Sequence, residues 1–332
     1  MRAHGRCDVD AHMMGNGSSN GGAGAAHEGN GHEARSRNGA PGKPRLQRWR
    51  LPRVTDRLAL GSRGLRVSPF CLGMVGEPST IQAAYDAGIN FFFVTTDMHW
   101  PLYEATRRGL ADLLTRDPGA RDKIVVAGVC YPTQPQFCTA PFAELVNAVP
   151  ELGRLDVLLA GGAYQAEFAN RLPVLVDHRR RRFLGSRAIG AAFHDRSAAR
   201  QAIDGGLVDI AGLRYNADHA GARLDLFPRL GDRPHPLLFG LQSASSWVSP
   251  ARMTELGLPA PGYWQPTVTD HYRFSLTAPQ MDGLVVTLQT PRDVSALVAD
   301  LEKGPLDEQE EKYLLDVAGL ARATGNRVAA QG

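Results

Sequence analysis

The stretch that decides the fold runs from Gly88 to Trp100 and reads Gly-Ile-Asn-Phe-Phe-Phe-Val-Thr-Thr-Asp-Met-His-Trp. Its first half is apolar, β-branched and aromatic, which is typical of a strand that is buried on both faces. Its second half ends in Asp97, His99 and Trp100, so the strand delivers polar and aromatic groups to one of its ends. Barrels of parallel strands present their chemistry in this way.

Outward from this stretch, short apolar runs alternate with helical patterns. We expect a hairpin first, around the turn Gly61-Ser-Arg-Gly64. Eight strands are then predicted, at 70–74, 89–95, 123–130, 155–160, 187–193, 208–215, 237–241 and 283–288. Helices are predicted at 79–87, 102–114, 141–148, 165–178, 197–203 and 308–323, with another that begins at Pro291 after Thr290 as its N-cap. Eight β-then-α units over roughly 270 residues predict a closed (β/α)8 TIM barrel, of class α/β, rather than an open sheet.

The first 47 residues differ in composition from the rest of the chain. They are rich in Gly, His, Asn, Ser and Arg and contain almost no Val, Ile, Leu or Phe. We expect residues 1–47 to form a disordered tail, because they cannot bury enough apolar surface to offset the entropy of ordering. The irregular spacing of His4, His12, His27 and His32 favours adventitious metal binding over a dedicated site. Residues 48–332 are expected to form one barrel domain.

Composition limits the partners of the protein. The chain of 332 residues is 43% hydrophobic and 21% charged, so it can bury a large core. Its formal net charge of +3 is small and its basic residues are dispersed, so no nucleic acid is expected as a partner. The one basic run, His178 to Arg182, is interpreted as a solvated helix end. Four cysteines without a Cys-x-x-Cys spacing favour a reducing cytoplasm, and no signal peptide or membrane span is expected.

Residues that directly follow the predicted strands are the candidates for a site, since the active site of such a barrel lies at the C-terminal ends of its strands. In chain order they are Asp97, His99 and Trp100, then Cys130 and Tyr131, then Gly161 to Tyr164, then His194 to Arg196, then Arg214 to His219, and finally Gln242 to Ser246. This rim holds three histidines, several carboxylates and two arginines. Such a set can support acid/base chemistry or bind an anionic group.

His99 is the leading catalytic candidate, and Asp97, His194, Tyr215 and His219 are the residues expected to assist it. Structural roles remain open for several of them. His99 can be a hydrogen-bonded rim residue, the segment after His194 can cap the next helix, and His219 can be held in a turn.

A metal site from Asp97, His99, His194 and His219 has suitable ligand types. The sequence nevertheless lacks a His-x-His or His-Glu-x-x-His spacing, so no metal site is predicted. Cys130 is interpreted as a small buried hydrophobe rather than a nucleophile.

Several segments, in order along the chain, carry a family resemblance. They are Leu60-Gly-Ser-Arg-Gly-Leu-Arg-Val-Ser-Pro-Phe-Cys-Leu-Gly73, Ala87-Gly-Ile-Asn-Phe-Phe92, Arg187-Ala-Ile-Gly190, Arg214-Tyr-Asn216 with His219-Ala-Gly-Ala222, Tyr272-Arg-Phe-Ser-Leu276 and Gly304-Pro-Leu-Asp307. Together they resemble the bacterial aldo/keto reductases. The resemblance implies a (β/α)8 barrel, a small-molecule ligand in the barrel mouth, a monomer, and NADPH-dependent carbonyl reduction by an Asp, Tyr, Lys and His tetrad.

The tetrad implied by the resemblance is not kept. The place of the tyrosine falls on His99, and that of the aspartate falls on Phe93 or Val94. The place of the lysine falls on Gly128 or Val129, and that of the histidine falls on Gly161.

The cofactor anchors implied by the family also differ. Ala192 and Phe193 stand where a Ser-Asn pair would bind the nicotinamide carboxamide, and Gly212 stands where a glutamine is expected. Arg292 can still meet a phosphate, although Asp293 would oppose one. Ser243 is the other candidate cofactor contact. The family therefore implies NADP while its anchors are missing, and the cofactor stays unknown.

Three functions are compatible with these residues. The leading hypothesis is a divergent reductase-like enzyme that acts on a small molecule without NADPH and uses His99 as acid/base, since an imidazole can transfer protons near neutral pH. An NADP-dependent oxidoreductase with a rearranged site is the second. A non-catalytic binding protein on the same barrel is the third.

Overall fold

The computed structural model describes residues 48–230, 236–258 and 264–329, with side chains described as far as residue 324. The expected disordered tail, residues 1–47, lies outside the described residues. The described residues belong to one compact unit. None of the helices in this part of the chain is both long enough and apolar enough to cross a membrane.

The predicted hairpin is present as a separate two-stranded antiparallel sheet of β1 (Leu58–Leu60) and β2 (Leu65–Val67). Its turn begins at Gly61 and ends at Gly64, which have φ angles of 61° and 76°. These left-handed conformations favour glycine. A Cβ atom on Gly61 would also lie 2.8 Å from the carboxylate of Asp209, so the turn fits closely against the barrel.

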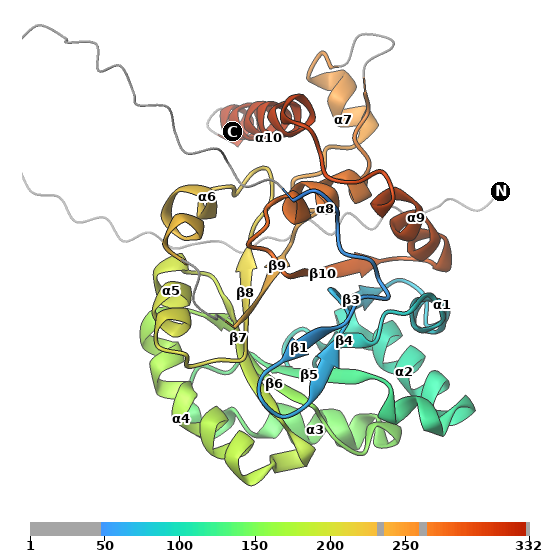
Figure 1. Ribbon diagram of the computed structural model, residues 1–332, viewed down its shortest axis with the longest axis vertical. Coiled ribbons are helices and arrows are strands. Elements are labelled where there is room, and N and C mark those ends of the chain that lie inside the picture. Colours follow the sequence, from blue (N-terminus) through green and yellow to red (C-terminus); the bar gives the residue numbers. More distant parts are fainter. Residues whose placement is uncertain (1–47, 231–235, 259–263, 330–332) are drawn as a thin grey trace, which may run out of the picture. The chain divides into compact units, whose positions relative to one another are not determined.

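All eight predicted barrel strands are present, and they form a closed barrel in the order β10-β3-β4-β5-β6-β7-β8-β9 (Figure 1). Every neighbouring pair is parallel. The strands are β3 (Phe70–Val75), β4 (Phe91–Val94), β5 (Val125–Cys130), β6 (Val157–Ala163), β7 (Ala188–Phe193), β8 (Ile210–Arg214), β9 (Leu237–Leu241) and β10 (Gly283–Leu288). The (β/α)8 barrel predicted from the alternation of elements is therefore confirmed.

Helices surround the barrel (Figure 1). The α-helices are α1 (Ser79–Ala87), α2 (Glu104–Arg116), α3 (Ala140–Ala148), α4 (Gln165–Arg181), α5 (Arg196–Asp204), α6 (Ala222–Asp225), α7 (Pro250–Glu255), α8 (Val268–Thr277), α9 (Pro291–Leu301) and α10 (Glu308–Ala329). The 3-10 turns are η1 (Trp100–Tyr103), η2 (Pro118–Asp122), η3 (Pro135–Phe137), η4 (Pro150–Leu152), η5 (Phe183–Gly185) and η6 (Phe227–Arg229).

Several helices differ from the predictions. The helix expected from Leu102 begins only at Glu104, because η1 with Pro101 precedes it. Helix α4 continues through Pro173 to Arg181, beyond the predicted end at His178. Helix α10 continues to Ala329, beyond the predicted end at residue 323. The short helices α6 and α7 and the helix α8 were not predicted. Residues 269 to 277 of α8 are all buried, so this segment lacks the polar face that marks a surface helix.

Polar side chains bind backbone at the N-terminal ends of alternate strands. The residue directly before each of β4, β6, β8 and β10 accepts a hydrogen bond from a backbone N–H of the preceding strand segment, at distances between 2.7 and 3.0 Å. The four acceptors are Asn90, Asp156, Asp209 and Asp282, and their donors are Ser68, Val126, Ile189 and Leu238. Each bond fixes one strand against its neighbour at the end opposite the candidate site.

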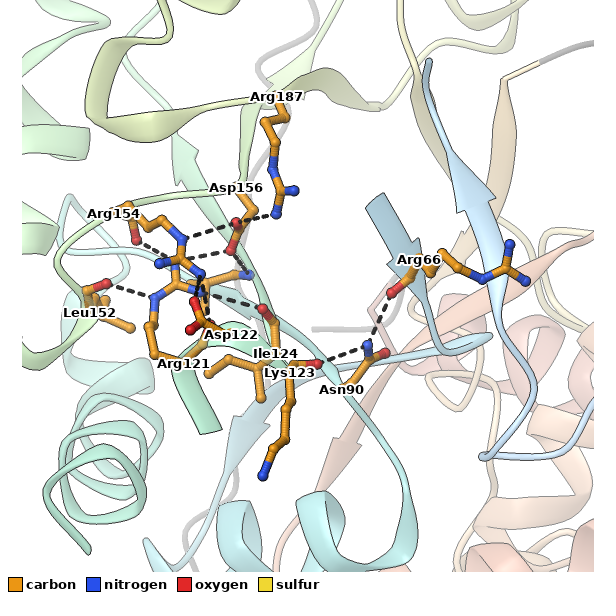
Figure 2. Close-up of polar contacts among 11 residues, drawn as sticks. Arg66, Asn90, Arg121, Asp122, Lys123, Ile124, Leu152, Arg154, Asp156 and Arg187 are labelled. Carbon is orange, nitrogen blue, oxygen red and sulfur yellow. Dashed lines mark hydrogen bonds and ion pairs between the residues drawn. The ribbon is translucent and has the colours of Figure 1, made fainter. Parts of the chain in front are cut away.

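Asp156 is the most heavily bonded of these four residues (Figure 2). Its fully buried carboxylate lies 3.0 Å from Arg121, 3.0 Å from Arg187 and 3.6 Å from Arg154. Burial lowers the pKa of Arg121, and Asp156 opposes that change. One buried carboxylate therefore contacts three guanidinium groups, of which Arg154 also pairs with Asp122.

Candidate functional site

The ends of β4 and β5 are joined by the carboxylate of Asp97. Its Oδ2 atom accepts a hydrogen bond from the Tyr131 N–H at 2.6 Å, and its Oδ1 atom accepts one from the His99 N–H at 3.4 Å. Thr95 adds a bond to the Val129 carbonyl at 2.8 Å. Asp97, a predicted site residue, thereby holds the backbone of both His99 and Tyr131.

The aromatic rings of His99 and Tyr131 meet at the barrel mouth. Their centroids lie 4.4 Å apart and their planes are nearly perpendicular, at 83°. The Tyr131 ring also lies against Gly161, where a Cβ atom would approach three ring carbons to between 2.6 and 2.8 Å. Tyr131 therefore occupies the space in which any side chain at residue 161 would begin.

Tyr131 was named as a rim residue but was not assigned to the site from the sequence. The signal that could have found it is the Gly161-Gly162 pair at the end of β6, because bare backbone allows a neighbouring ring to approach. Burial, followed by the nearby charge of Asp97, raises the pKa of the Tyr131 hydroxyl well above its usual value. The hydroxyl therefore stays protonated at neutral pH and can donate a hydrogen bond.

His194 lies on the other side of the glycine pair. Its ring stacks on Tyr164 at 5.4 Å, and a Cβ atom on Gly162 would lie 3.6 Å from its Nε2 atom and 3.7 Å from the Tyr131 ring. Burial, and then the charge of Arg214, lowers the pKa of His194. The next residue, Asp195, caps α5 by accepting the Ser197 N–H at 2.8 Å.

The polar side chains Asp97, His99, Tyr131, His194 and His219 at the strand ends are called the polar arc. His219 is its last member along the chain and is held in a turn. Its N–H donates to Asn216 at 2.8 Å, and its Nε2 atom lies 3.3 Å from a guanidinium nitrogen of Arg214. Burial, followed by the charge of Arg214, lowers its pKa. The turn interpretation of His219 is therefore compatible with its contacts, and Arg214 favours the neutral form of both His194 and His219.

Tyr215 lies away from this arc. It is fully buried, its ring packs against Phe227 and Phe274, and its hydroxyl accepts a hydrogen bond from Arg223. A ligand in the barrel mouth would have to displace this packing to reach it. The structure thus brings together His99, Tyr131 and His194, but separates Tyr215 from them.

The residues present do not fit NADP in the manner of the family. At the start of α9, Arg292 is exposed, but the Asp293 carboxylate accepts the N–H groups of Gln289 and Thr290, each at 2.9 Å. A carboxylate therefore already stands where a phosphate would need those donors and the helix dipole. Ser243 is buried, and its hydroxyl has no hydrogen-bond partner among the described residues.

The positions that the sequence resemblance assigns to the nicotinamide carboxamide carry no polar side chains. Ala192 and Phe193 end β7, and a Cβ atom on Gly212 would lie 3.1 to 3.2 Å from Leu241. No residue at these positions can anchor a carboxamide through its side chain.

The four-ligand metal site that was considered from the sequence, but not predicted, is not supported. Within the described ranges, no group of three or more His, Cys, Asp or Glu side chains could hold a metal ion. Asp97, His99, His194 and His219 are instead spread over the ends of three strands, β4, β7 and β8.

An apolar pocket lies inside the barrel. It is lined by residues of β3, β4, β6, β7, β8, β9 and β10, namely Cys71, Phe91, Phe93, Leu159, Ala191, Ala192, Ile210, Gly212, Phe239, Leu241 and Val285. None of the histidines or charged residues of the rim lines it. Exposed apolar side chains occur on the loops that follow β4, β5 and β6, and they are Met98, Trp100, Leu102, Phe137 and Tyr164. The mouth therefore combines a polar arc with apolar surfaces.

Comparison with known proteins supports the resemblance at the level of fold. Neither a protein-family model nor a curated protein matches the sequence. Among solved structures, the holo form of an aldo-keto reductase from Bacillus halodurans is similar with a TM-score of 0.62 and 12% identity, over 79% of this chain and 96% of that one. A putative aldo-keto reductase from Pseudomonas aeruginosa is similar with a TM-score of 0.56 and 17% identity, over 76% of this chain and 97% of that one. The chain therefore has the barrel fold of the aldo-keto reductases.

Proposed function

We propose that the protein is a divergent aldo/keto reductase-like enzyme that transforms a small molecule without a nicotinamide cofactor and uses His99 as its acid/base. The observation that carries this proposal is the edge-on contact of His99 with Tyr131 at 4.4 Å, with Tyr131 lying against Gly161. In the family, a tyrosine follows the second barrel strand and a histidine ends the fourth. Here a histidine follows the second strand, and a tyrosine ring from the third covers the end of the fourth. Both ring types are therefore present, but they come from the second and third barrel strands rather than from the second and fourth.

The residues around His99 support a division of roles. His99 is half-buried, so a ligand can reach it while part of its ring stays packed. Tyr131, which is protonated at neutral pH, would donate a hydrogen bond to an oxygen of the substrate. Asp97 would position both residues through their backbone N–H groups. His194 would accept a hydrogen bond, because burial and Arg214 favour its neutral form.

The apolar surfaces indicate the class of substrate. The pocket inside the barrel has a volume of only about 20 Å³, which is too small for an aliphatic or aromatic group, so such a group would pack mainly on exposed apolar residues of the rim such as Trp100. Burial of such a group would supply binding energy, while the polar arc would orient an oxygen-bearing group. We therefore propose a small substrate with an apolar body and a polar, oxygen-containing end.

A binding protein is the second candidate, and the apolar interior of the barrel favours it. No histidine or charged side chain of the rim lines the small pocket there, so the interior of the barrel offers a ligand no acid or base. Under this alternative, the protein retains a ligand without consuming it.

Incubation of the purified protein with a mixture of small metabolites, followed by mass spectrometry, tests the proposal. We expect at least one compound to be consumed without added nucleotide, and we expect His99→Ala to abolish the consumption. His178→Ala is the matched control, because His178 lies at the far end of α4, where it stacks on Phe183. A compound that is bound but never consumed would favour the binding protein, and equal rates for His99→Ala and the wild type would overturn the role of His99.

A further inference from the structure

Arg214 is the last residue of β8, and its side chain is exposed at the C-terminal end of that strand. Ile210 and Gly212 of the same strand line the pocket inside the barrel. Because alternate residues of a strand point to the same face, Arg214 continues their column and faces the barrel mouth. Tyr215, the next residue, is fully buried and packs against Phe274 of α8 on the other face. The guanidinium therefore lies at the mouth, next to the apolar interior.

The register of the barrel places Arg214 beside His194. Phe193 of β7 pairs with Leu213 of β8, so His194 and Arg214, which follow directly, lie side by side at the ends of these two parallel strands. Burial lowers the pKa of His194, and the charge of Arg214 adds to this effect, as expected for close neighbours. Arg214 therefore stands within the polar arc, between His194 and His219.

The contact with His219 orients the guanidinium without cancelling its charge. Arg214 Nη1 lies 3.3 Å from His219 Nε2. A guanidinium can only donate a hydrogen bond, so Nε2 accepts it and Nδ1 carries the proton of a neutral ring. The Asp218 carboxylate lies 3.4 Å from this Nδ1 atom, on the opposite side of the imidazole, and it pairs with Arg322 at 3.3 Å. The direct partner of Arg214 is therefore a neutral group.

Within the described ranges, no carboxylate lies at ion-pair distance from Arg214, although other arginines of the neighbouring loops are paired. Arg196 pairs with Asp225 at 2.6 Å, and Arg223 pairs with Glu311 at 2.9 Å. Of the nitrogen atoms of Arg214, Nη1 alone is hydrogen bonded to another described residue. The edge formed by its Nε and Nη2 atoms is thus available to a ligand that carries negative charge.

Bare backbone connects this cation with the proposed acid/base. Gly162 lies between His194 and Tyr131, since a Cβ atom there would be 3.6 Å from the His194 Nε2 atom and 3.7 Å from the Tyr131 ring. The Tyr131 ring in turn meets His99 at 4.4 Å. A molecule held at Arg214 can therefore extend over Gly162 toward the pair of rings.

We propose that Arg214 binds the carboxylate of a small, monoanionic substrate whose oxygen-bearing reactive group meets Tyr131 and His99. This inference rests on the proposed function, because it names the class of substrate for the same site. The guanidinium edge offers two parallel N–H groups that match the two oxygens of a carboxylate. A phosphate dianion would need further donors, but the N-terminus of α5, which follows β7, is already capped by Asp195, which accepts the Ser197 N–H at 2.8 Å.

Calorimetric titration of the full-length protein tests the site with benzoate, 3-phenylpropionate and hexanoate, each compared with its neutral amide. We expect at least one carboxylate to bind in the millimolar range or more tightly, and its amide to bind about tenfold to a hundredfold more weakly, as for the loss of charged hydrogen bonds. Arg214→Met should weaken binding of the carboxylate by a similar factor and leave that of the amide unchanged. Arg200→Met is the matched control and should bind like the wild type, because Arg200 lies on α5 and pairs with Asp204 at 3.6 Å.

The proposal would be overturned by a wild type that binds none of the carboxylates, by amides that bind as tightly as the acids, or by unchanged affinity in Arg214→Met. Phenyl phosphate that binds more tightly than benzoate would overturn the choice of a carboxylate. If Arg214→Met does not fold, Arg214→Lys replaces it. This variant keeps the charge but loses the two parallel N–H groups, so it should bind the carboxylate more weakly, and equal affinity would overturn the role of the guanidinium edge.

Failure of this inference can be told apart from failure of the proposed function, because the titrations involve no turnover. Carboxylates that bind through Arg214, combined with consumption that is unchanged in His99→Ala, would overturn only the role of His99. Consumption of neutral compounds that depends on His99, combined with no binding of carboxylates, would overturn only the role of Arg214.

Discussion

Asp156→Asn tests the account of how the barrel is held beneath its site. The substitution keeps the shape of the side chain but removes the charge that compensates Arg121, Arg154 and Arg187. In one orientation the new amide N–H group faces the arginine donors. In the other it faces the Val126 N–H, which then loses the oxygen acceptor that lies 3.0 Å away in the wild type. Removing one partner of a buried ion pair costs about 3–5 kcal/mol. Because Asp156 is fully buried and Arg121 is only 7% exposed, we expect a loss within this range.

Asp122→Asn is the matched control in the same network (Figure 2). Asp122 also bonds Arg154, at 2.9 Å, but its side chain is 83% exposed. Exposed ion pairs contribute at most about 1 kcal/mol, so the control should lose no more than this. Urea unfolding, followed by circular dichroism, gives the free energy of unfolding of both variants. Their midpoints are compared where the dependence of this free energy on urea concentration is the same. If both variants lost the same small amount of stability, the carboxylate of Asp156 would not compensate the three arginines as we describe.

Three further predictions concern other parts of the molecule. Burial lowers the pKa of His271 in the folded protein to about 4. In the unfolded protein this imidazole takes up a proton below about pH 6.5, whereas in the folded protein it does so only near pH 4. The contribution of His271 to the free energy of unfolding should therefore be complete above pH 6.5 and fall by about 3 kcal/mol toward pH 4. Urea midpoints measured over this range should fall less in His271→Gln than in the wild type, and an identical fall would contradict the prediction. Calorimetric titration with NADPH should give no saturable heat up to millimolar concentration, and saturation would favour the rearranged oxidoreductase. Gly161→Ala should lower the free energy of unfolding by about 1–3 kcal/mol and displace Tyr131, whereas Gly319→Ala, where the new methyl group meets open space, should be neutral or stabilising. Equal stabilities of the two variants would refute the close packing of Tyr131.

The alternation of apolar runs and helical patterns was sufficient to predict the barrel, because each buried strand is long enough to be recognised. The stretch from Gly88 to Trp100 illustrates this, since its Phe-Phe-Phe-Val run is β4. Helix α8 could not be recognised in the same way, because its surroundings bury both its polar and its apolar residues. That burial depends on packing against β10 and α9, which a local pattern of residues within α8 does not show.

The repeat of a polar residue directly before alternate strands was visible in the sequence but was not used. Asn90, Asp156, Asp209 and Asp282 each precede an apolar run. Only the register of neighbouring strands shows that each side chain accepts a backbone N–H from the strand before it. A pattern of this kind predicts strand starts once the barrel topology is assumed.

The rim residues could be predicted from strand ends, but their contacts could not. Arg214 and Tyr215 are adjacent in the chain, yet one is exposed and the other is fully buried, as expected when successive side chains point to opposite faces. The contact between His99 and Tyr131 joins two different strand ends, and the place for it is created by Gly161 on a third. Such a contact follows from closure of the barrel rather than from the spacing of residues.

Histidine-ring NMR during addition of a compound that the wild type consumes tests the central claim most directly. The two ring nitrogens of each histidine are followed in 15N-labelled protein, and single substitutions assign the signals. We expect the His99 signals to shift and saturate over the concentration range in which turnover saturates, while those of His178 and His271 stay in place. A His99 ring that does not respond while turnover is saturated would contradict the proposal that His99 is the acid/base.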